Sequence, residues 1–279
     1  MNIRHLETLS LSIIIPAFNT GTQLIDLVDS LTEFFQNKLN FDIIIVDDSG
    51  DNNRLSFNHQ AVKYFKLKNN YGQHLATYYG ILQAKGQHIL TLDDDVILPE
   101  EKLEVILSRL KEPNDLQYFV NDDYTEIDKI KFSIIKIFFR FALFRTPPKY
   151  GTSQRLLTQE LVQKIIAKNY RYIYVDALLM LQSESKTHCV NYIAKNKSPE
   201  LKNRYSLSNR LFLLTNSYLF YTPLAAQIAY LWLIIGMCLL VYYAVPIIGL
   251  AFILTFIIAS VFAMWGYTTV VTANDIETA

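Results

Sequence analysis

The chain has 279 residues, of which 51% are hydrophobic and 19% are charged, and its 26 basic and 26 acidic side chains cancel. This balance excludes the large basic excess that is typical of nucleic-acid-binding proteins, so no nucleic-acid partner is expected. The hydrophobic share also argues against a disordered chain, and the charged share is below the about 25% of an ordinary soluble domain.

The first 120 residues alternate between short apolar runs and apolar residues at helical spacing. This pattern predicts strand 11–15, helix 22–35, strands 41–46 and 62–67, helix 74–84, strand 88–92, helix 100–110 and strand 116–120. Such alternation is typical of an α/β fold with a mostly parallel sheet and helices on both faces. Ligands of these sheets bind beyond the carboxyl ends of the strands, so polar residues there are the candidates for chemistry.

Residues 128–145 differ from the alternating part of the chain. Lys129, Ser133, Lys136 and Arg140 are four, three and four residues apart and share one helical face, while most other positions are Ile or Phe. This distribution predicts an amphipathic helix that lies in the membrane interface. An ordinary amphipathic helix that packs on the protein core is the alternative.

The C-terminal part of the chain is apolar enough to cross a membrane. From Leu211 to Asn274 there is no Asp, Glu, Lys or Arg. As one helix, at about 1.5 Å per residue, this stretch would be about three times as long as a bilayer core of about 30 Å is thick. It therefore predicts a transmembrane segment over 223–273 with two helices, about 224–245 and 248–271.

The remaining chain divides into a globular domain, 1–200, and a juxtamembrane helix, 201–222. No signal peptide is visible before the domain. Lys202, Arg204 and Arg210 precede the first predicted span, and the turn between the spans carries no charge. Because positive residues stay on the cytosolic side, we expect a multi-pass protein of the cytoplasmic (inner) membrane whose globular domain faces the cytosol.

Three adjacent acids, Asp93, Asp94 and Asp95, directly follow the predicted strand 88–92. Three neighbouring carboxylates repel one another unless a cation lies among them. In an extended backbone Asp93 and Asp95 point the same way, and paired carboxylates suit Mg²⁺ or Mn²⁺ together with substrate phosphates. The sequence thus predicts a metal site at Asp93 and Asp95, and a solvated acidic loop is the alternative.

Polar residues also follow two of the other predicted strands. Asp47 and Asp48 come after strand 41–46, and their carboxylates can accept hydrogen bonds from a nucleobase or from ribose hydroxyls. Gly72 permits a tight turn, and Gln73 and His74 begin a predicted helix whose N-terminus suits an anion. A turn rich in polar residues, and a structural histidine, are the alternatives.

These motifs together resemble the family-2 glycosyltransferases of GT-A fold. The matching segments are 12–19 (SIIIPAFN), 45–49 (IVDDS), 70–74 (NYGQH) and 92–95 (LDDD). The resemblance implies a GT-A, Rossmann-like sheet with helices on both faces, followed by a two-helix transmembrane hairpin.

Within that family the chain looks most like the polyprenyl-phosphate glycosyltransferases, which include dolichol-phosphate mannose synthase. Residues 203–206 (NRYS) and 221–224 (YTPL) resemble the juxtamembrane segment of those enzymes. Residues 71–74 (YGQH), the pair 150–151 (YG) and Arg155 are similar to the transferases that load 4-deoxy-4-formamido-arabinose onto undecaprenyl phosphate.

The resemblance implies an inverting transfer, in which an oxygen of a polyprenyl (undecaprenyl) phosphate attacks the anomeric carbon of a nucleotide-sugar, with Mg²⁺ or Mn²⁺ as cofactor. The product would serve cell-envelope glycan synthesis or modification. The residues implied in catalysis are Asp93, Asp95, Ser153 and Arg155. Those implied in nucleotide-sugar binding are Pro16, Asn19, Asp47, Asp48, Gly72, Gln73, Asp93 and Asp94. Those implied in binding the lipid phosphate are Arg204, Lys136 and Arg140.

Two alternatives stay open at this point. The enzyme could use another lipid-linked acceptor, or the chain could be a catalytically silent GT-A scaffold in the membrane. Ser153 stands where some relatives have Asp, which raises the question of a catalytic base. A phosphate monoester is largely a dianion at pH 7 and needs little help from a base, so this difference does not exclude the reaction. Homo-oligomerisation is also left open.

Overall fold

The computed structural model describes residues 9–50, 55–121, 153–168, 170, 173–184, 188–192 and short stretches closer to the C-terminus, at 232, 235–238, 251, 254–255 and 276–278. The predicted interfacial helix with Lys136 and Arg140, the juxtamembrane helix with Arg204, and most of the two predicted spans lie outside the described residues. Within the part that is described, no helix combines the length and the apolar character needed to cross a bilayer.

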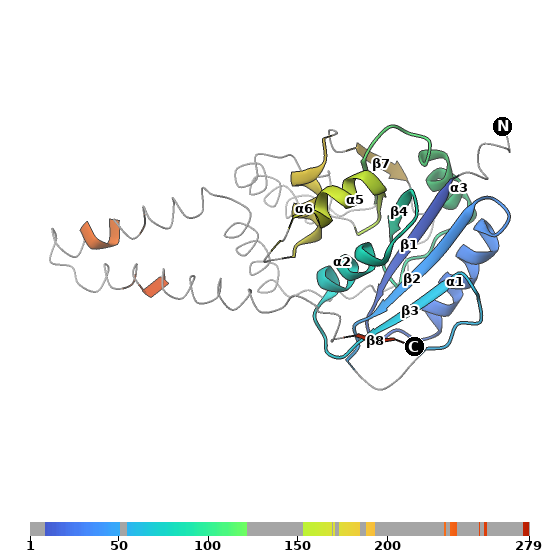
Figure 1. Ribbon diagram of the computed structural model, residues 1–279, viewed down its shortest axis with the longest axis horizontal. Helices are drawn as coiled ribbons and strands as arrows, with labels where there is room; N and C mark the ends of the chain where they lie inside the picture. Colours follow the sequence, from blue (N-terminus) through green and yellow to red (C-terminus); the bar gives the residue numbers. More distant parts are fainter. Residues whose placement is uncertain are drawn as a thin grey trace.

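Eight strands of the described chain form one sheet in the order β7-β5-β6-β4-β1-β2-β3-β8 (Figure 1). Their bounds are β1 Ser10–Ala17, β2 Asn40–Asp47, β3 Val62–Leu67, β4 His88–Thr91, β5 Leu116–Asn121, β6 Arg155–Thr158, β7 His188–Tyr192 and β8 Ile276–Thr278. Strands β3, β2, β1 and β4 are parallel to their neighbours in that order, as β5 is to β7. Strand β6 runs antiparallel between β4 and β5, and β8 runs antiparallel to β3. The mostly parallel α/β sheet is therefore confirmed.

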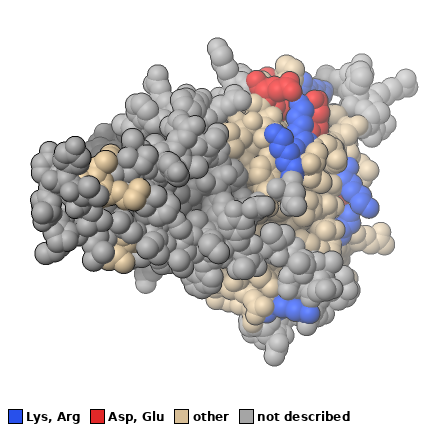
Figure 2. Space-filling view, turned by 60° about the vertical axis from the view of Figure 1, so that its left-hand side comes forward, with Lys and Arg blue, Asp and Glu red and all other residues tan. Residues whose placement is uncertain are grey.

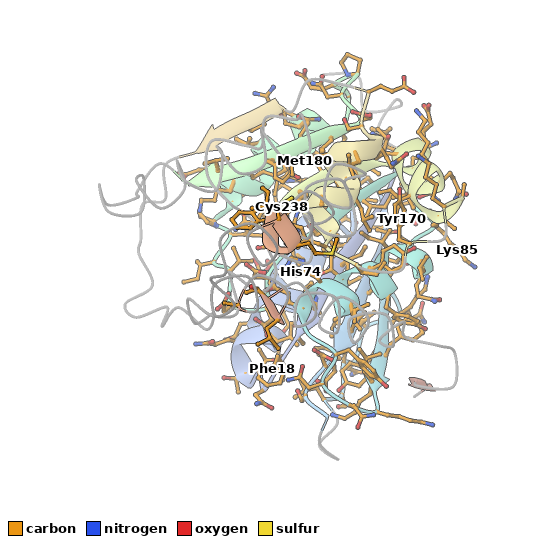
Figure 3. The ribbon with its side chains drawn as sticks, turned by 90° about the vertical axis from the view of Figure 1, so that its left-hand side faces the viewer. Phe18, His74, Lys85, Tyr170, Met180 and Cys238 are labelled. Atoms are coloured by element: carbon orange, nitrogen blue, oxygen red, sulfur yellow. The ribbon has the colours of Figure 1, made fainter. Side chains whose placement is uncertain are left out.

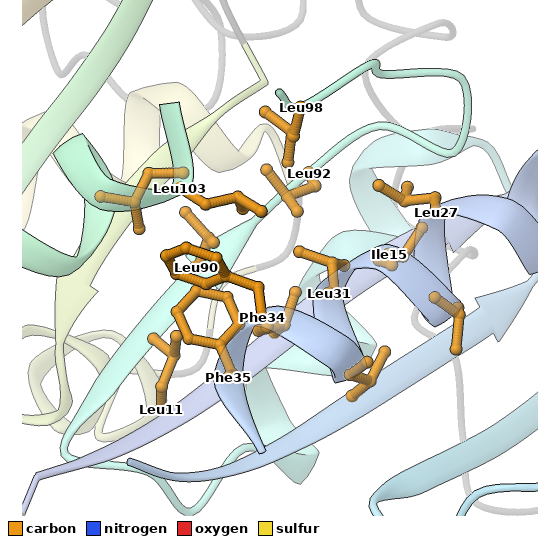
Figure 4. Close-up of a cluster of buried hydrophobic side chains, with 14 of the residues drawn as sticks. Leu11, Ile15, Leu27, Leu31, Phe34, Phe35, Leu90, Leu92, Leu98 and Leu103 are labelled. Carbon is orange, nitrogen blue, oxygen red and sulfur yellow. The ribbon is translucent and has the colours of Figure 1, made fainter. Parts of the chain in front are cut away.

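Helices cover both faces of the sheet because the strand residues alternate between two cores. Ile13, Ile15 and Leu90 belong to the core under α1 (Thr22–Phe35) and α3 (Glu100–Arg109), which Figure 4 shows in close-up. Ile14 and Ile89 point to the opposite core, under the helices on the other face. These helices are α2 Gln73–Gln83, α5 Gln159–Ile166 and α6 Val175–Gln182. Both faces of the strands are thus apolar, as expected for a covered parallel sheet.

A close contact between α2 and β1 holds the helix that begins at the candidate site. A methyl group added at Gly80 would meet Ile14 Cγ2 at 2.4 Å. We expect Gly80→Ala to lower the free energy of unfolding by about 1–3 kcal/mol, because overpacking outweighs the gain in helix propensity. Thermal unfolding of the full chain in detergent measures this effect. Gly21→Ala is the control, since nothing lies within 4 Å of its added methyl. A Gly80→Ala variant as stable as the wild type would contradict the close approach.

Candidate active site

The candidate site lies at one edge of the sheet, where three parallel strands end. Strands β1, β2 and β4 run in the same direction, so the residues that follow them, including Asp48 and Asp93, emerge together. Strand β6 is antiparallel to β4 and pairs Arg155 with Thr91, so Ser153, just before β6, reaches the same edge. The sheet topology thus joins residues that are about 60 positions apart in the chain.

Asp93 connects two other elements of the fold at this edge. Its Oδ1 accepts a hydrogen bond of 2.5 Å from Gln73 Nε2, at the start of α2, and its Oδ2 accepts one from the Ser153 hydroxyl. Burial raises the pKa of Asp93, and so does the negative charge of Asp95, while the bonds from Ser153 and Gln73 and the charge of Arg155 act against this rise. A positive charge bound here would relieve both the burial cost and the repulsion.

The Asp94 carboxylate contacts the backbone at Phe18, just after β1. Its Oδ2 accepts a hydrogen bond of 3.0 Å from the Phe18 amide, and the side chain is buried. Strand β4 ends at Thr91, and residues 94–95 form a turn, so the acidic triplet does not continue the extended backbone that the sequence suggested. The bond from the Phe18 amide joins the middle carboxylate to the residue that follows β1.

Asp93 and Asp95 fit the donor set of a divalent cation that also binds substrate. Both are half-buried carboxylates, and the charge of one raises the pKa of the other, as expected for neighbouring groups. Among the residues that the structure describes, no three His, Cys, Asp or Glu side chains gather as a complete metal site. Mg²⁺ commonly uses one or two carboxylates and takes its other ligands from water and phosphate oxygens. A cation held here would therefore depend on substrate for part of its shell.

Asp48 shapes the loop that leads into α2. Its two oxygens accept hydrogen bonds of 2.7 Å from the backbone amides of Tyr71 and Gly72. Gly72 has a φ of 91°, in the left-handed region that glycine tolerates best. Burial raises the pKa of Asp48 to about 6, and the two backbone bonds act against that rise. The carboxylate thus places Gly72 and, next to it, Gln73.

Asp47 is engaged on both oxygens by protein groups. Its Oδ1 accepts bonds from the Ser49 amide, 2.9 Å, and hydroxyl, 2.5 Å. Its Oδ2 accepts a bond from the Tyr64 hydroxyl and a buried ion pair of 2.9 Å from Lys66. Burial acts to raise the pKa of Asp47, but these bonds outweigh it and the pKa is lowered. The Ser49 hydroxyl oxygen in turn accepts a hydrogen bond of 2.9 Å from the Asn19 amide. Asn19 has a φ of 52°, in the left-handed region.

Arg155 is buried and forms an ion pair with half-buried Asp176, next to Ser153. Its Nε and Nη2 donate to the two oxygens of Asp176 at 2.7 and 2.9 Å. Its Nη1 donates to the Ser153 carbonyl at 2.8 Å and to the Thr91 hydroxyl at 3.3 Å. Burial acts to lower the pKa of Arg155, but the charge of Asp176 and its bonds raise it overall. All donor groups of Arg155 named here therefore meet protein oxygens.

His74 lies beside this ion pair, in the first turn of α2. Its ring packs edge-on against Tyr174, with 4.6 Å between the ring centroids. In the view of Figure 3, His74 lies between Phe18, after β1, and Met180, in α6. Burial lowers the pKa of His74 to about 4, with the charges of Asp176 and Arg155 acting in opposite directions. His74 is therefore a neutral imidazole at pH 7.

The low pKa of His74 makes a testable contribution to stability. The unfolded chain has a histidine pKa of about 6.5, so below that pH it binds more protons than the folded protein. We expect the wild type to lose about 2 kcal/mol relative to His74→Gln as the pH falls from 7 to 5. Unfolding of both proteins across this range measures the difference, and the opposite contribution of Asp48 cancels because both proteins contain it. Parallel pH profiles would contradict a half-buried, neutral His74.

The structure brings together most of the predicted residues that it describes. Asp93 contacts both Gln73 and Ser153. Arg155 donates to the Ser153 carbonyl, and Asp48 accepts a bond from the Gly72 amide. Pro16 is buried in β1 and pairs with Val46, close to Asn19. Asp176, Thr91 and Tyr118 were missed. A single acid in the apolar stretch 173–181 was the one signal in the sequence, since such a carboxylate needs a buried partner.

Charged side chains outside the site form small groups. Figure 2 shows Lys and Arg beside Asp and Glu on the face it displays, without one extended area of a single sign among the described residues. Exposed ion pairs such as Lys38 with Glu104 and Lys63 with Asp42 mix the two charges. This distribution agrees with the balanced composition.

Comparison with known families supports the resemblance of the motifs. The family model of glycosyl transferase family 2 matches residues 12–176, which include every described residue of the site. An undecaprenyl-phosphate 4-deoxy-4-formamido-L-arabinose transferase of Yersinia pestis is 26% identical over 177 residues, 60% of this chain and 54% of that protein. Its counterpart in Pseudomonas savastanoi pv. phaseolicola is 32% identical over 114 residues, 38% of this chain and 34% of that protein. The chain thus spans about half or less of the length of these curated relatives.

Solved structures share the fold at low sequence identity. Glucosyl-3-phosphoglycerate synthase of Mycobacterium tuberculosis, in complex with uridine diphosphate, has a TM-score of 0.56 and 14% identity, covering 78% of this chain and 84% of that one. Mannosyl-3-phosphoglycerate synthase of Rubrobacter xylanophilus has a TM-score of 0.53 and 17% identity, covering 77% and 74%. At these identities the comparison establishes the arrangement of the sheet and helices.

Proposed function

The chain belongs to glycosyl transferase family 2, and we propose that it is a membrane-anchored inverting enzyme that moves a sugar from a nucleotide-sugar to a polyprenyl phosphate. One observation carries the proposal. Asp93, at the end of β4, is bonded to Gln73 of α2 and to Ser153 before β6. An acid triplet in a solvated loop would not need partners from two other elements. The carboxyl edge of the sheet is also where α/β folds bind their ligands.

The donor nucleotide would bind along the edge formed by the ends of β1 and β2 and the start of α2. Asp48 holds the amides of Tyr71 and Gly72 and thereby places Gln73 at the helix N-terminus, where a diphosphate is favoured. Pro16, Asn19 and Asp94 would shape the opposite wall, since the Asp94 carboxylate fixes the backbone at Phe18. Asp47 would contribute mainly by ordering Ser49, because each of its oxygens already accepts two hydrogen bonds from protein groups, whereas each oxygen of Asp93 accepts one.

Asp93 and Asp95 would hold Mg²⁺ or Mn²⁺, which would stabilise the negative charge that develops on the departing nucleoside diphosphate. The donor set fits this role, because the negative charge of Asp95 raises the pKa of the neighbouring Asp93 and a cation would relieve that repulsion. Gln73 and Ser153 keep Asp93 in one orientation through their two hydrogen bonds. Arg155 acts on the site through Ser153, and its guanidinium is already paired with Asp176.

The acceptor assignment draws on the relatives. Proteins of Proteus mirabilis, Pseudomonas and Yersinia that carry undecaprenyl phosphate in their names match this chain. A phosphate monoester is largely a dianion at pH 7, so its oxygen can attack without a strong base. The Ser153 hydroxyl donates a hydrogen bond to Asp93, and this role does not require Ser153 to act as a base. Arg204, Lys136 and Arg140 would meet the lipid phosphate at the cytosolic surface of the inner membrane.

A transfer assay tests the proposal. The purified full chain in detergent would be incubated with undecaprenyl phosphate, Mn²⁺ or Mg²⁺ and a panel of nucleotide-sugars. We expect a lipid-linked sugar with one donor and its disappearance with EDTA. Transfer to a different lipid-linked acceptor would replace the polyprenyl-phosphate assignment. Absence of any turnover over the whole panel, with no metal bound, would favour a catalytically silent scaffold.

A further inference from the structure

An ion pair between buried Arg155 and half-buried Asp176 lies next to the candidate site and contacts it at the Ser153 carbonyl. Arg155 is 4% exposed, and two of its nitrogens meet both oxygens of Asp176 at 2.7 and 2.9 Å. Asp176 lies in the first turn of α6, on the opposite side of Arg155 from Ser153. A bidentate pair of this kind fixes the plane of the guanidinium as well as its position.

The third nitrogen of Arg155 transmits this restraint toward the acidic triplet. Nη1 donates to the Ser153 carbonyl at 2.8 Å and to the Thr91 hydroxyl at 3.3 Å. The Thr91 hydroxyl also donates to the Ser153 carbonyl, at 2.5 Å. Two donors thus hold the backbone of Ser153, whose hydroxyl donates to Asp93. The contacts run without interruption from α6 to the candidate metal ligand.

Asp176 itself has little capacity left for a substrate. Its Oδ1 accepts bonds from Arg155 and from the Tyr118 hydroxyl, at 3.2 Å, and its Oδ2 accepts the second bond from Arg155. The Tyr118 ring also lies 6.0 Å from the Arg155 guanidinium carbon. A carboxylate so engaged can orient its neighbours but is poorly placed to take part in transfer directly.

We propose that Asp176 is a positioning residue of the donor site, which acts through Arg155 and Ser153 to fix the orientation of Asp93. This inference rests on the proposed function and adds to it a residue that lies outside the motifs of the sequence. Removal of a residue that hydrogen-bonds to a metal ligand typically lowers metal affinity or activity by about 10- to 100-fold. Such an effect at Asp176 would have to travel through two side chains.

The test compares Asp176→Asn with a matched variant at the other end of α6. Asp115 accepts bonds from the Ser183 hydroxyl, 2.7 Å, and the Glu184 amide, 2.9 Å, just after the helix ends. Asp115→Asn therefore makes the same chemical change against the same helix, away from the site. The readouts are the kcat and KM for the donor, thermal unfolding, and Mn²⁺ affinity in the presence of UDP, followed by the electron paramagnetic resonance of free Mn²⁺.

We expect Asp176→Asn to lower kcat by about 10- to 100-fold and to weaken Mn²⁺ binding by about tenfold, with little change in donor KM. Asp176→Glu, which keeps the charge, should recover part of both losses. Asp115→Asn should change only the unfolding temperature. If both Asn variants leave kcat and Mn²⁺ affinity within about twofold of wild type, the pair is merely structural and the proposal is overturned.

The metal readout separates this proposal from the proposed function. A wild type that binds Mn²⁺ but transfers no sugar, with binding weakened by Asp176→Asn alone, would support positioning and reject the transfer. A wild type that transfers sugar, with Asp176→Asn equal to Asp115→Asn, would support the transfer and reject positioning. A wild type with neither property would overturn both.

Discussion

Asp95→Asn is expected to reduce sugar transfer by about 100-fold or more while the protein stays folded. The neutral amide removes one of the two carboxylates proposed for the metal, and the loss of Lewis-acid stabilisation corresponds to several kcal/mol of activation free energy. Without metal, the repulsion that Asp95 exerts on Asp93 also disappears, so the variant should be at least as stable as the wild type. The kcat and the unfolding temperature of both proteins measure the two effects.

Addition of Mn²⁺ makes this prediction more specific. The wild type should gain thermal stability when the cation is added, because ligand binds the folded state, and Asp95→Asn should gain much less. Asp29→Asn, an exposed acid on α1, is the matched control and should behave as the wild type does. Full activity of Asp95→Asn would show that the acid triplet does not hold a catalytic metal.

Arg155→Met is expected to destabilise the globular domain and to abolish transfer. Removal of the guanidinium leaves Asp176, whose side chain is 20% exposed, without its charged partner. Breaking a fully buried pair typically costs about 3–5 kcal/mol, and the partial exposure of Asp176 reduces the expected loss to about 2–4 kcal/mol. Loss of Nη1 also leaves the Ser153 carbonyl with the bond from the Thr91 hydroxyl alone, of the two it accepts here. Denaturant unfolding of the full chain in detergent gives the free energy.

A double variant separates the two consequences of this change. Arg155→Met with Asp176→Leu removes the unpaired charge, so most of the stability should return, as it often does when apolar groups replace a buried pair. Transfer should stay low because the Ser153 carbonyl then keeps only the bond from the Thr91 hydroxyl and has lost the one from Arg155. An Arg155→Met protein that loses less than about 1 kcal/mol would contradict the buried pair, and a double variant with full activity would contradict its role at the site.

The sheet of the first 120 residues could be predicted closely because its strands and helices have clear periods. Helix α1 begins at Thr22 and ends at Phe35, and β3 spans Val62–Leu67, as the apolar spacing predicts. The later elements are short, with four residues in β6 and eight in each of α5 and α6. Segments of this length carry too few apolar positions to show a period, so their sequence gives no clear signal.

The candidate site was predicted residue by residue but not as a set of contacts. Asp93 and Ser153 were both candidates, yet their hydrogen bond follows from the antiparallel placement of β6 beside β4, which depends on long-range packing. Asp94 was expected to bind nucleotide-sugar, and in the structure its carboxylate supports Phe18. Asp176 was missed because its partner, Arg155, lies 21 positions away on another element. Neighbouring motifs in the sequence do not reveal such pairs.

The most direct test of the central claim is to identify both products of one reaction. The full chain, a nucleotide-sugar donor that it turns over, undecaprenyl phosphate and Mn²⁺ would be analysed by mass spectrometry for the lipid and for the released nucleotide. The account predicts a sugar on undecaprenyl monophosphate together with a nucleoside diphosphate. A lipid diphosphate with release of a nucleoside monophosphate, or a donor that is consumed without any lipid-linked sugar, would contradict it.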